Sequence, residues 1–308
     1  MATTTAHDPR TADELRRRML AAVPMTERSV RLAGVTTAVV EGGEGPPIVL
    51  LHGQGEFWGV WLRVLDDLMR THRVIVVDLP GHGASLEIAG ALDADTMVRW
   101  VDELLDETCD EPPVLVGHLL GGAIAARYAV THGRRLAHLV LVDALGLNWF
   151  RPSPRFALPM VAFLARPTPA SRDRLFDRCF VDFDRVGDGF GDLWDVLRDY
   201  ALDRARTPEN QAALRALMPR VGVPPIPRDE LDRIDAPTTL IHGRDDLQVP
   251  LKAARRASER HGWPLHVIDG ARDDPAAEEP QAFLDALRSA IEHPHDRPHD
   301  RRPREERA

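Results

Sequence analysis

Runs of strand-forming residues alternate with helical patterns along much of the chain, and this alternation is the feature that most limits its possible folds. The strand signals are short apolar or β-branched runs at 30–32, 36–40, 48–51, 74–78, 113–116 and 139–143. Helical patterns at 58–69 and 96–107 separate the later runs. Strands that alternate with helices of this length are typical of a parallel, doubly wound sheet. The pattern therefore predicts an α/β protein with a mostly parallel sheet.

A helical segment interrupts this alternation. Between about residues 147 and 227 only helical signals occur, broken by repeated prolines, and strand signals return at 238–241 and 265–268. We expect this segment to be a helical cap inserted over the sheet. The predicted division is an N-terminal arm at 1–28, an α/β core at 29–146 and 228–291, the cap at 147–227, and a charged, disordered tail at 292–308.

Composition limits the kinds of molecule that the protein can bind and the cellular compartment in which it can work. The formal net charge of −9 argues against a nucleic-acid surface, since phosphate binding requires clustered Lys and Arg. Two cysteines provide neither a disulfide framework nor metal-ligand spacing, which favours a reducing compartment. The longest apolar run near the N-terminus, Met19–Val23, is far shorter than the ~20 residues of a membrane span. We expect a cytoplasmic protein with small-molecule or protein partners, no membrane, no metal and no cofactor; a homo-oligomer stays open.

One short motif bears directly on chemistry. Residues 117–121 read Gly-His-Leu-Leu-Gly, directly after a buried strand and before a helical pattern. This is the context of a strand-turn-helix elbow in which two glycines flank a nucleophilic serine. Leu119 stands at the serine position, and an aliphatic side chain cannot attack a carbonyl. The motif predicts the architecture of an elbow without its nucleophile.

Three further motifs occur in a definite order around the elbow. They are His52-Gly53-Gln54-Gly55, the turn Asp78-Leu79-Pro80-Gly81-His82-Gly83, and the loop Gly243-Arg244-Asp245-Asp246-Leu247-Gln248-Val249-Pro250. With the elbow, they make residues 29–291 similar to the capped members of the α/β-hydrolase family. The resemblance implies the α/β-hydrolase fold with a helical cap. It also implies that Asp246 occupies the position of the family's catalytic acid.

The same resemblance places the family's catalytic histidine before the final helix. The matching stretch is 270–280, and its register is held by Gly270, Pro275, Glu278 and Pro280. The histidine position then falls on Asp273. Leu119 and Asp273 thus replace the nucleophile and the general base of a Ser-His-Asp triad, and loss of such a triad leaves only ~10³ to 10⁴-fold acceleration over water. We therefore expect no ordinary acyl-enzyme hydrolysis.

The backbone groups that could bind a substrate do not depend on the serine and histidine side chains that are absent here. The backbone N–H groups of Leu120, at a helix N-terminus, and of Gln54, after Gly53, are predicted to converge as an oxyanion site. With Leu119 on its floor and the cap above, the pocket would be apolar with a few polar groups. We expect it to bind a small apolar, carbonyl-bearing molecule between cap and sheet.

Several ionisable groups could act at this site. Asp246 and Asp273 are expected to face one region, where one carboxylate raises the pKa of the other and makes it a general acid or base. In the alternative, Arg272 or Arg244 neutralises the pair as an ion network. His118, beside the elbow, is a third tentative catalytic residue, and His52 a weaker one. Asp143 is an alternative acid to Asp246, whereas Asp78 and His82 are taken as turn-forming residues.

Three functional hypotheses follow from these residues. The preferred one is a non-hydrolytic enzyme, namely a lyase, isomerase or cyclase, that works through the oxyanion donors and an aspartate. The second is a catalytically inactive pseudo-hydrolase that binds a ligand or a protein. The third is a slow ester hydrolase in which an aspartate activates a water molecule.

Overall fold

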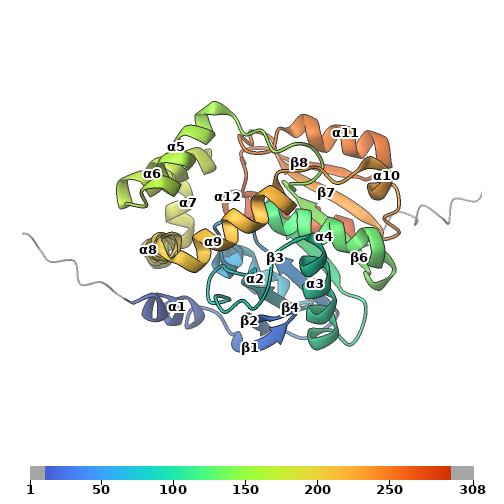
Figure 1. The fold of residues 1–308 in the computed structure, drawn as a ribbon, viewed down its shortest axis with the longest axis horizontal. Helices are drawn as coiled ribbons and strands as arrows, with labels where there is room; N and C mark the ends of the chain where they lie inside the picture. The colour runs from blue at the N-terminus through green and yellow to red at the C-terminus, as the bar shows by residue number, and fades with distance from the viewer. Residues whose placement is uncertain (1–10, 293–308) are drawn as a thin grey trace, which may run out of the picture.

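The computed structural model describes residues 11–292, in which one β-sheet is covered by helices on both faces (Figure 1). Except for Glu292, the predicted tail lies outside the described residues, as do the first ten residues of the predicted arm. The strands are β1 (Thr26–Leu32), β2 (Val35–Gly42), β3 (Pro47–Leu51), β4 (Arg73–Val77), β5 (Val114–His118), β6 (His138–Val142), β7 (Thr238–Gly243) and β8 (Leu265–Ile268).

The helices are of three kinds. The α-helices are α1 (Ala12–Leu20), α2 (Leu62–Leu68), α3 (Ala94–Thr108), α4 (Leu119–His132), α5 (Pro154–Ala165), α6 (Pro169–Cys179), α7 (Phe183–Phe190), α8 (Trp194–Arg206), α9 (Pro208–Leu217), α10 (Arg228–Leu231), α11 (Leu251–His261), α12 (Pro275–Glu278) and α13 (Pro280–Glu292). The 3₁₀-helices are η1 (Trp58–Trp61), η2 (Gly133–Arg135) and η3 (Gly191–Leu193), and η4 (Met218–Gly222) is a π-helix.

The sheet has the strand order β1-β2-β4-β3-β5-β6-β7-β8. Its first two pairings, β1 with β2 and β2 with β4, are antiparallel, and the remaining pairings are parallel. A two-residue turn joins β1 to β2, and both of its residues, Ala33 and Gly34, have positive φ, as a tight hairpin requires. The predicted α/β architecture with a mostly parallel sheet is confirmed.

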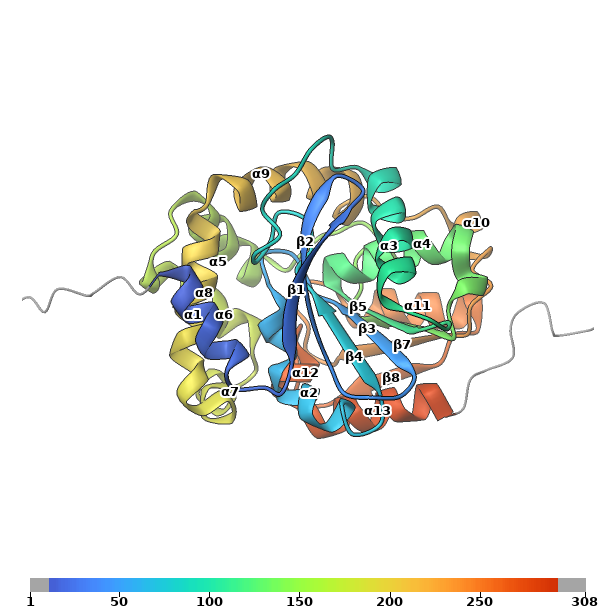
Figure 2. The same cartoon turned by 90° about the horizontal axis from the view of Figure 1, so that it is seen from below.

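Two apolar layers hold the helices on the sheet. Val49 and Leu51 of β3 face α3 and α4, whereas Ile48 and Leu50 face α2 and α13. Successive residues of a strand point to opposite faces, so a run of buried aliphatic residues provides a core on both sides. Figure 2 shows these helices distributed around the strands. The helices therefore hold the carboxyl ends of the parallel strands in place. The loops that follow these ends contain the candidate site residues.

Only helical elements and loops lie between β6 and β7. Helices α5 to α8 lie to one side of the sheet in both views (Figures 1 and 2), and α8 packs against α1. They occupy the place of the helical cap of the fold, while the exact division into arm, core, cap and tail stays a prediction. Among residues 11–292, no helix is long and apolar enough to cross a membrane.

Candidate active site

The elbow between β5 and α4 is present in the structure. Leu119, the first residue of α4, has a φ of 45°, a left-handed conformation that costs about 1–3 kcal/mol for a residue other than glycine. Glycine is required nearby, because a Cβ on Gly121 would lie 2.5 Å from the carbonyl oxygen of Leu51. The backbone that normally presents a nucleophile is therefore retained, and a fully buried leucine side chain occupies it.

Backbone donors surround this elbow. Leu120 is the second residue of α4, where N–H groups have no acceptor within the helix, and the N–H of Gly121 donates to the His52 carbonyl at 3.1 Å. The N–H of Gly53 donates to Glu56 Oε2 at 2.6 Å, so it cannot also hold a substrate oxygen. Leu120 and Gln54 stay the predicted oxyanion donors, and Gly53 instead orients the Glu56 side chain.

Asp246 lies in the loop after β7, where backbone groups orient its carboxylate. Its Oδ1 accepts the N–H groups of Gln248 at 2.6 Å and Val249 at 3.0 Å. Its Oδ2 is buried and accepts no hydrogen bond from the described residues. Burial raises the pKa of Asp246 to about 7, even though these two N–H groups favour the ionised form.

Asp273 lies close to Asp246, as predicted, and Gln248 connects the two loops. Gln248 Nε2 donates to Asp273 Oδ2, and Gln248 Oε1 accepts from Gln54 Nε2 at 2.8 Å. Asp273 Oδ1 is buried and has no partner among the described residues. Burial, followed by the charge of Asp246, raises the pKa of Asp273 well above its usual value.

Neither arginine of the proposed ion network reaches these carboxylates. Arg244 pairs with Asp269 at the surface, and Arg272 donates to the backbone carbonyls of Asp177 and Phe180. The prediction that one of these arginines neutralises the pair is therefore wrong. Their side chains leave the site because backbone carbonyls and an exposed carboxylate are closer partners.

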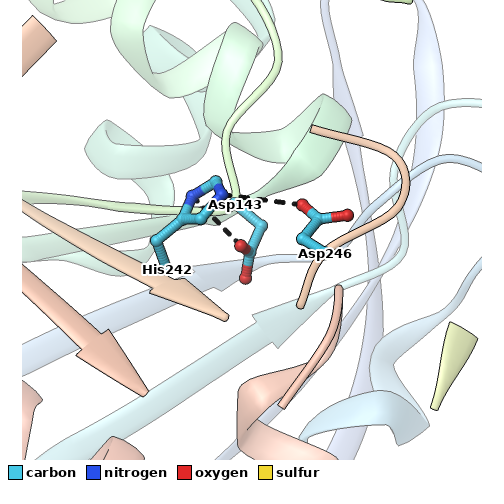
Figure 3. Close-up of side chains that lie close together, drawn as sticks. All are labelled: Asp143, His242 and Asp246. Carbon is cyan, nitrogen blue, oxygen red and sulfur yellow. Dashed lines mark ion pairs between the residues drawn. The ribbon is translucent and has the colours of Figure 1, made fainter. Parts of the chain in front are cut away.

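Asp143, His242 and Asp246 form a second group in the same region (Figure 3). Their side chains come from the ends of the neighbouring strands β6 and β7 and from the loop that follows β7. His242 Nδ1 lies 3.1 Å from Asp143 Oδ1 and its Nε2 lies 3.8 Å from Asp246 Oδ2. Three ligand atoms within 4.8 Å of one another could hold a divalent cation.

Hydrogen bonding accounts for both ring nitrogens of His242 without an ion, whereas Asp143 Oδ2 and Asp246 Oδ2 have no partner among the described residues. His242 Nε2 donates to the Val249 carbonyl at 2.9 Å, which leaves Nδ1 as an acceptor. Burial lowers the pKa of His242 to about 4, and burial together with the charge of Asp246 raises the pKa of Asp143 well above its usual value. A protonated Asp143 can therefore donate to Nδ1. That no metal binds stays a prediction.

His118 lies between two acceptors. Its Nδ1 is 3.1 Å from Glu56 Oε2, and its Nε2 contacts the backbone carbonyl of Asp273. Burial alone would lower the pKa of His118, but the Glu56 carboxylate raises it well above its usual value. The two acceptors and the Glu56 carboxylate thus favour the charged imidazolium form of His118. In this state it is a cation beside the carboxylates and has no free lone pair to act as a base.

The two other histidines and Asp78 have structural partners. His52 Nε2 accepts the N–H of Leu79 at 3.0 Å, and His82 Nδ1 lies 3.1 Å from the Pro80 carbonyl oxygen. Burial lowers the pKa of His82 to about 4. Asp78 Oδ2 accepts from Ala84 N–H at 2.9 Å and from Arg16 at 2.7 Å. These contacts fix the turn after β4, which agrees with the turn-forming role predicted for Asp78.

The site is closed in this conformation. Leu119 is fully buried and Asp273 is 3% exposed. A cavity of about 690 Å³ lies elsewhere, between α1 and the segment from α7 to α8, and its lining is acidic. An apolar pocket between cap and sheet stays a prediction, and its use would require the cap helices to move.

Two residues of this site carried no recognisable signal in the sequence. Glu56 reaches His118 because the loop after β3 turns back on the elbow, and Gln248 joins Asp273 to Gln54 across 25 and 194 positions of sequence separation. Both lie in or beside the matched motifs. Only their contacts in three dimensions connect them to the catalytic positions.

Curated relatives have similar sequences over most of the chain. A human (lyso)-N-acylphosphatidylethanolamine lipase is 29% identical over 80% of this chain and 79% of its own length. A 2-hydroxymuconate semialdehyde hydrolase from Pseudomonas sp. (strain CF600) is 29% identical over 75% of this chain and 81% of its own. These relatives are named as hydrolases, which contradicts the expectation of a lyase, isomerase or cyclase and its inactive alternative. That Leu119 and Asp273 exclude a covalent route, and that Leu120 and Gln54 are oxyanion donors, stay predictions.

Solved structures and family models agree on the scaffold. The crystal structure of naproxen esterase from Bacillus subtilis superposes with a TM-score of 0.77 at 17% identity, over 90% of this chain and 95% of that one. A sequence model described as "Alpha/beta hydrolase family" matches residues 48–286. This match spans β3 to α13, and with them the elbow and both aspartate loops. The chain therefore belongs to the alpha/beta hydrolase family.

Proposed function

We propose that this protein hydrolyses carboxylic esters of small apolar molecules by direct attack of water, with Asp273 as the general base. The relatives named as lipase and hydrolase support hydrolysis as the reaction class. The observation that carries the proposal is the buried Asp273 Oδ1, which has no hydrogen-bond partner among the described residues. A water molecule between this oxygen and a substrate carbonyl would satisfy it.

The step balances without a covalent intermediate. The water oxygen bonds to the carbonyl carbon while Asp273 takes one proton from the water. The carbonyl oxygen becomes an oxyanion, which the N–H groups of Leu120 and Gln54 hold. Collapse of the tetrahedral intermediate breaks the ester C–O bond. The leaving alcohol oxygen receives the proton from Asp273, so the carboxylate is regenerated and the products are an acid and an alcohol.

The surrounding groups support this role. Gln248 fixes the orientation of Asp273 through Oδ2, and the same Gln248 is bonded to Gln54, which carries one predicted oxyanion donor. The positive charge of His118 favours the ionised form of Asp273, whereas burial and Asp246 oppose it. Asp273 acts as a base only in its ionised form, and because its pKa is raised, we expect hydrolysis to speed up as the pH rises and this carboxyl loses its proton.

The finer features of the substrate and the setting belong to the proposal. Leu119 and Leu120 supply an apolar floor at the elbow, which suits an apolar acyl or alcohol group. The carboxylate and backbone chemistry described here requires no cofactor. Two free cysteines are consistent with a reducing, cytoplasmic setting.

Hydrolysis of p-nitrophenyl esters of short fatty acids tests the proposal. We expect the wild-type protein to release p-nitrophenol, and Asp273→Asn to lower kcat by more than about 100-fold, since it removes the general base. Asp245→Asn, a change of an exposed carboxylate in the loop beside Asp246, is the matched control and should leave kcat unchanged. Equal rates for the wild type and Asp273→Asn would show that Asp273 is not the base.

A further inference from the structure

Most of the exposed large hydrophobic side chains among the described residues lie on or beside the cap helix α5. Leu158, Val161 and Leu164 are 73%, 58% and 49% exposed, and Trp149, just before the helix, is 55% exposed. Among the described residues, these are four of the five large hydrophobic side chains recorded as exposed; the fifth, Val181, is also in the cap. Exposed apolar side chains that cluster in this way mark a binding surface rather than ordinary scatter.

Two of these side chains, Leu158 and Val161, share one face of the helix, and Leu164 lies beside that face. Leu158, Val161, Ala162 and Ala165 are exposed and follow the spacing i, i+3, i+4 and i+7. The opposite face of α5 is buried, because Phe156 and Phe163 pack in a small apolar cluster with residues of α6 and α8. The exposed residues are therefore not needed to hold α5 on the cap. Figure 1 shows α5 on the outside of the cap, away from the sheet.

The charge around this face is opposite to that of the whole chain. No Asp or Glu occurs between Asp143 and Asp173, although the chain has 48 acidic residues and a net charge of −9. The same segment contains exposed arginines at both ends of α5, namely Arg151, Arg155 and Arg166. None of the three forms an ion pair with another described residue, unlike Arg172, which is buried and bonded to Asp173 and Asp199. The arginines are therefore available to an anionic partner.

We propose that α5 and Trp149 form a docking surface for an anionic lipid bilayer. An apolar face flanked by arginines, with a Trp at its edge, matches the hydrocarbon boundary and the phosphate layer of such a bilayer. Helix α5 has 12 residues, too few to span a membrane, so it would lie in the interface. The sequence predicts no membrane partner, because no segment is long enough to span a bilayer; this proposal departs from that prediction, since a helix that lies in the interface need not span it. The proposal goes beyond the proposed hydrolysis and does not depend on it.

The acidic part of the cap would orient the molecule on the bilayer. Asp184, Asp188, Asp192 and Asp195 line the groove between α7 and α8, next to α1. Anionic lipids repel this groove, so only the α5 side of the cap can approach the headgroups. Binding is then expected to be weak and reversible. It should also decrease at high salt, since the electrostatic attraction to the surface is screened.

Sedimentation of the full chain with lipid vesicles tests the docking surface. Wild-type protein should bind vesicles that contain phosphatidylglycerol and should bind phosphatidylcholine vesicles much less. Leu158→Asp should reduce the partition coefficient about tenfold or more, because a buried leucine side chain contributes to partitioning and a charge opposes it. Arg155→Glu should reduce it by at least about fivefold, from the loss of one basic side chain near the surface.

A matched charge control and an oligomer measurement make the test decisive. Arg256→Glu changes an exposed arginine of α11 that forms no ion pair with another described residue, and this variant should bind vesicles like the wild type. All variants alter exposed residues, so their thermal unfolding should match the wild type. Absence of binding to phosphatidylglycerol vesicles, or equal loss in Arg256→Glu, would overturn the proposal. So would a dimer that light scattering detects and Leu158→Asp dissociates, because α5 would then be an interface between copies of the chain.

Discussion

Leu119 holds a backbone conformation that leucine rarely adopts, at the position where this fold usually presents its nucleophile. The conformation is over-determined by its surroundings: Gly117 and Gly121 have no room for a Cβ, and α4 begins directly after β5. The elbow is thus a property of the backbone packing and does not depend on the side chain at its tip. A serine introduced there should take up the same conformation.

We therefore predict that Leu119→Ser combined with Asp273→His becomes reactive toward a fluorophosphonate. Serine is smaller than leucine, which leaves volume for an imidazole, and Asp246 is already placed to orient that ring. Intact-mass spectrometry should detect one adduct on the double variant. Leu119→Ser alone, which has no histidine at position 273, should stay unlabelled. A folded double variant without an adduct would show that the remaining site is not arranged for covalent chemistry.

Asp246 should control the pH dependence of hydrolysis through its charge. Because that charge raises the pKa of Asp273, Asp246→Asn should lower that pKa and move the acidic limb of the kcat/KM profile to lower pH. The asparagine Oδ1 can still accept the N–H groups of Gln248 and Val249, so the loop should keep its structure. Rates measured from acidic to alkaline pH give the limb directly. If the acidic limb does not move, the charge of Asp246 does not influence the pKa of the general base.

Part of this site could be predicted from residue types and register. The placement of Asp273 beside Asp246 followed from the family resemblance, whose register Gly270, Pro275, Glu278 and Pro280 hold, and the structure brings the two carboxylates together. The pairing of His118 with Glu56 could not be predicted, because no periodicity links a loop residue to one that lies 62 positions away. The arginine network was mispredicted for the same reason. Sequence adjacency to an aspartate says little about the direction of a long side chain.

Helix α1 packs on the core through Leu15 and Met19, and one buried arginine adds polar contacts to the rest of the molecule. Arg16 is 6% exposed and contacts Asp78 at 2.7 Å, Glu27, and the Tyr200 hydroxyl of α8 at 3.2 Å. It thus connects the N-terminal helix to the turn after β4 and to the cap. Because Asp78 is completely buried, loss of its cationic partner would leave an uncompensated charge.

Arg16→Ala is accordingly predicted to lower the free energy of unfolding by about 3–5 kcal/mol. Urea denaturation followed by tryptophan fluorescence measures this change. Arg17→Ala, on the exposed side of the same helix, is the control and should change stability by less than about 0.5 kcal/mol. Similar losses for the two variants would mean that helix propensity matters here and the buried ion pair does not.

At the level of elements, the alternating pattern predicted the strands well and the cap helices poorly. Aliphatic runs such as 48–51 and 139–143 identify β3 and β6, because strands buried on both faces contain few polar residues. In the cap, Pro159 was treated as a break, yet α5 continues through it from Pro154 to Ala165. A proline removes one helical hydrogen bond, and packing of Phe156 and Phe163 on α6 and α8 can outweigh that loss.

The stability of the whole molecule should fall as the pH rises above neutrality. Burial raises the pKa of Asp246 and Asp274 to about 7 and that of Glu278 to about 8, so the folded state binds more protons than the unfolded chain. This contribution is fully present below the unfolded pKa values and is lost as pH rises through the folded ones. His82 and His242, whose pKa burial lowers to about 4, oppose it only below about pH 6.5.

Between about pH 6.5 and about pH 8, the free energy of unfolding is therefore predicted to decrease, with about 1 kcal/mol from Asp246 alone. Denaturant titrations at a series of pH values measure the slope. Asp246→Asn should flatten it by that amount, because the amide does not titrate. A stability that rises over this interval would contradict the raised carboxyl pKa values.

Intact-mass spectrometry of the wild-type protein, quenched while it turns over a p-nitrophenyl ester, tests water attack most directly. The predicted result is steady release of p-nitrophenol from a protein whose mass never changes, since water attacks the ester and no acyl-enzyme forms. An acyl adduct on any residue, or no release of product above the buffer rate, would contradict the account.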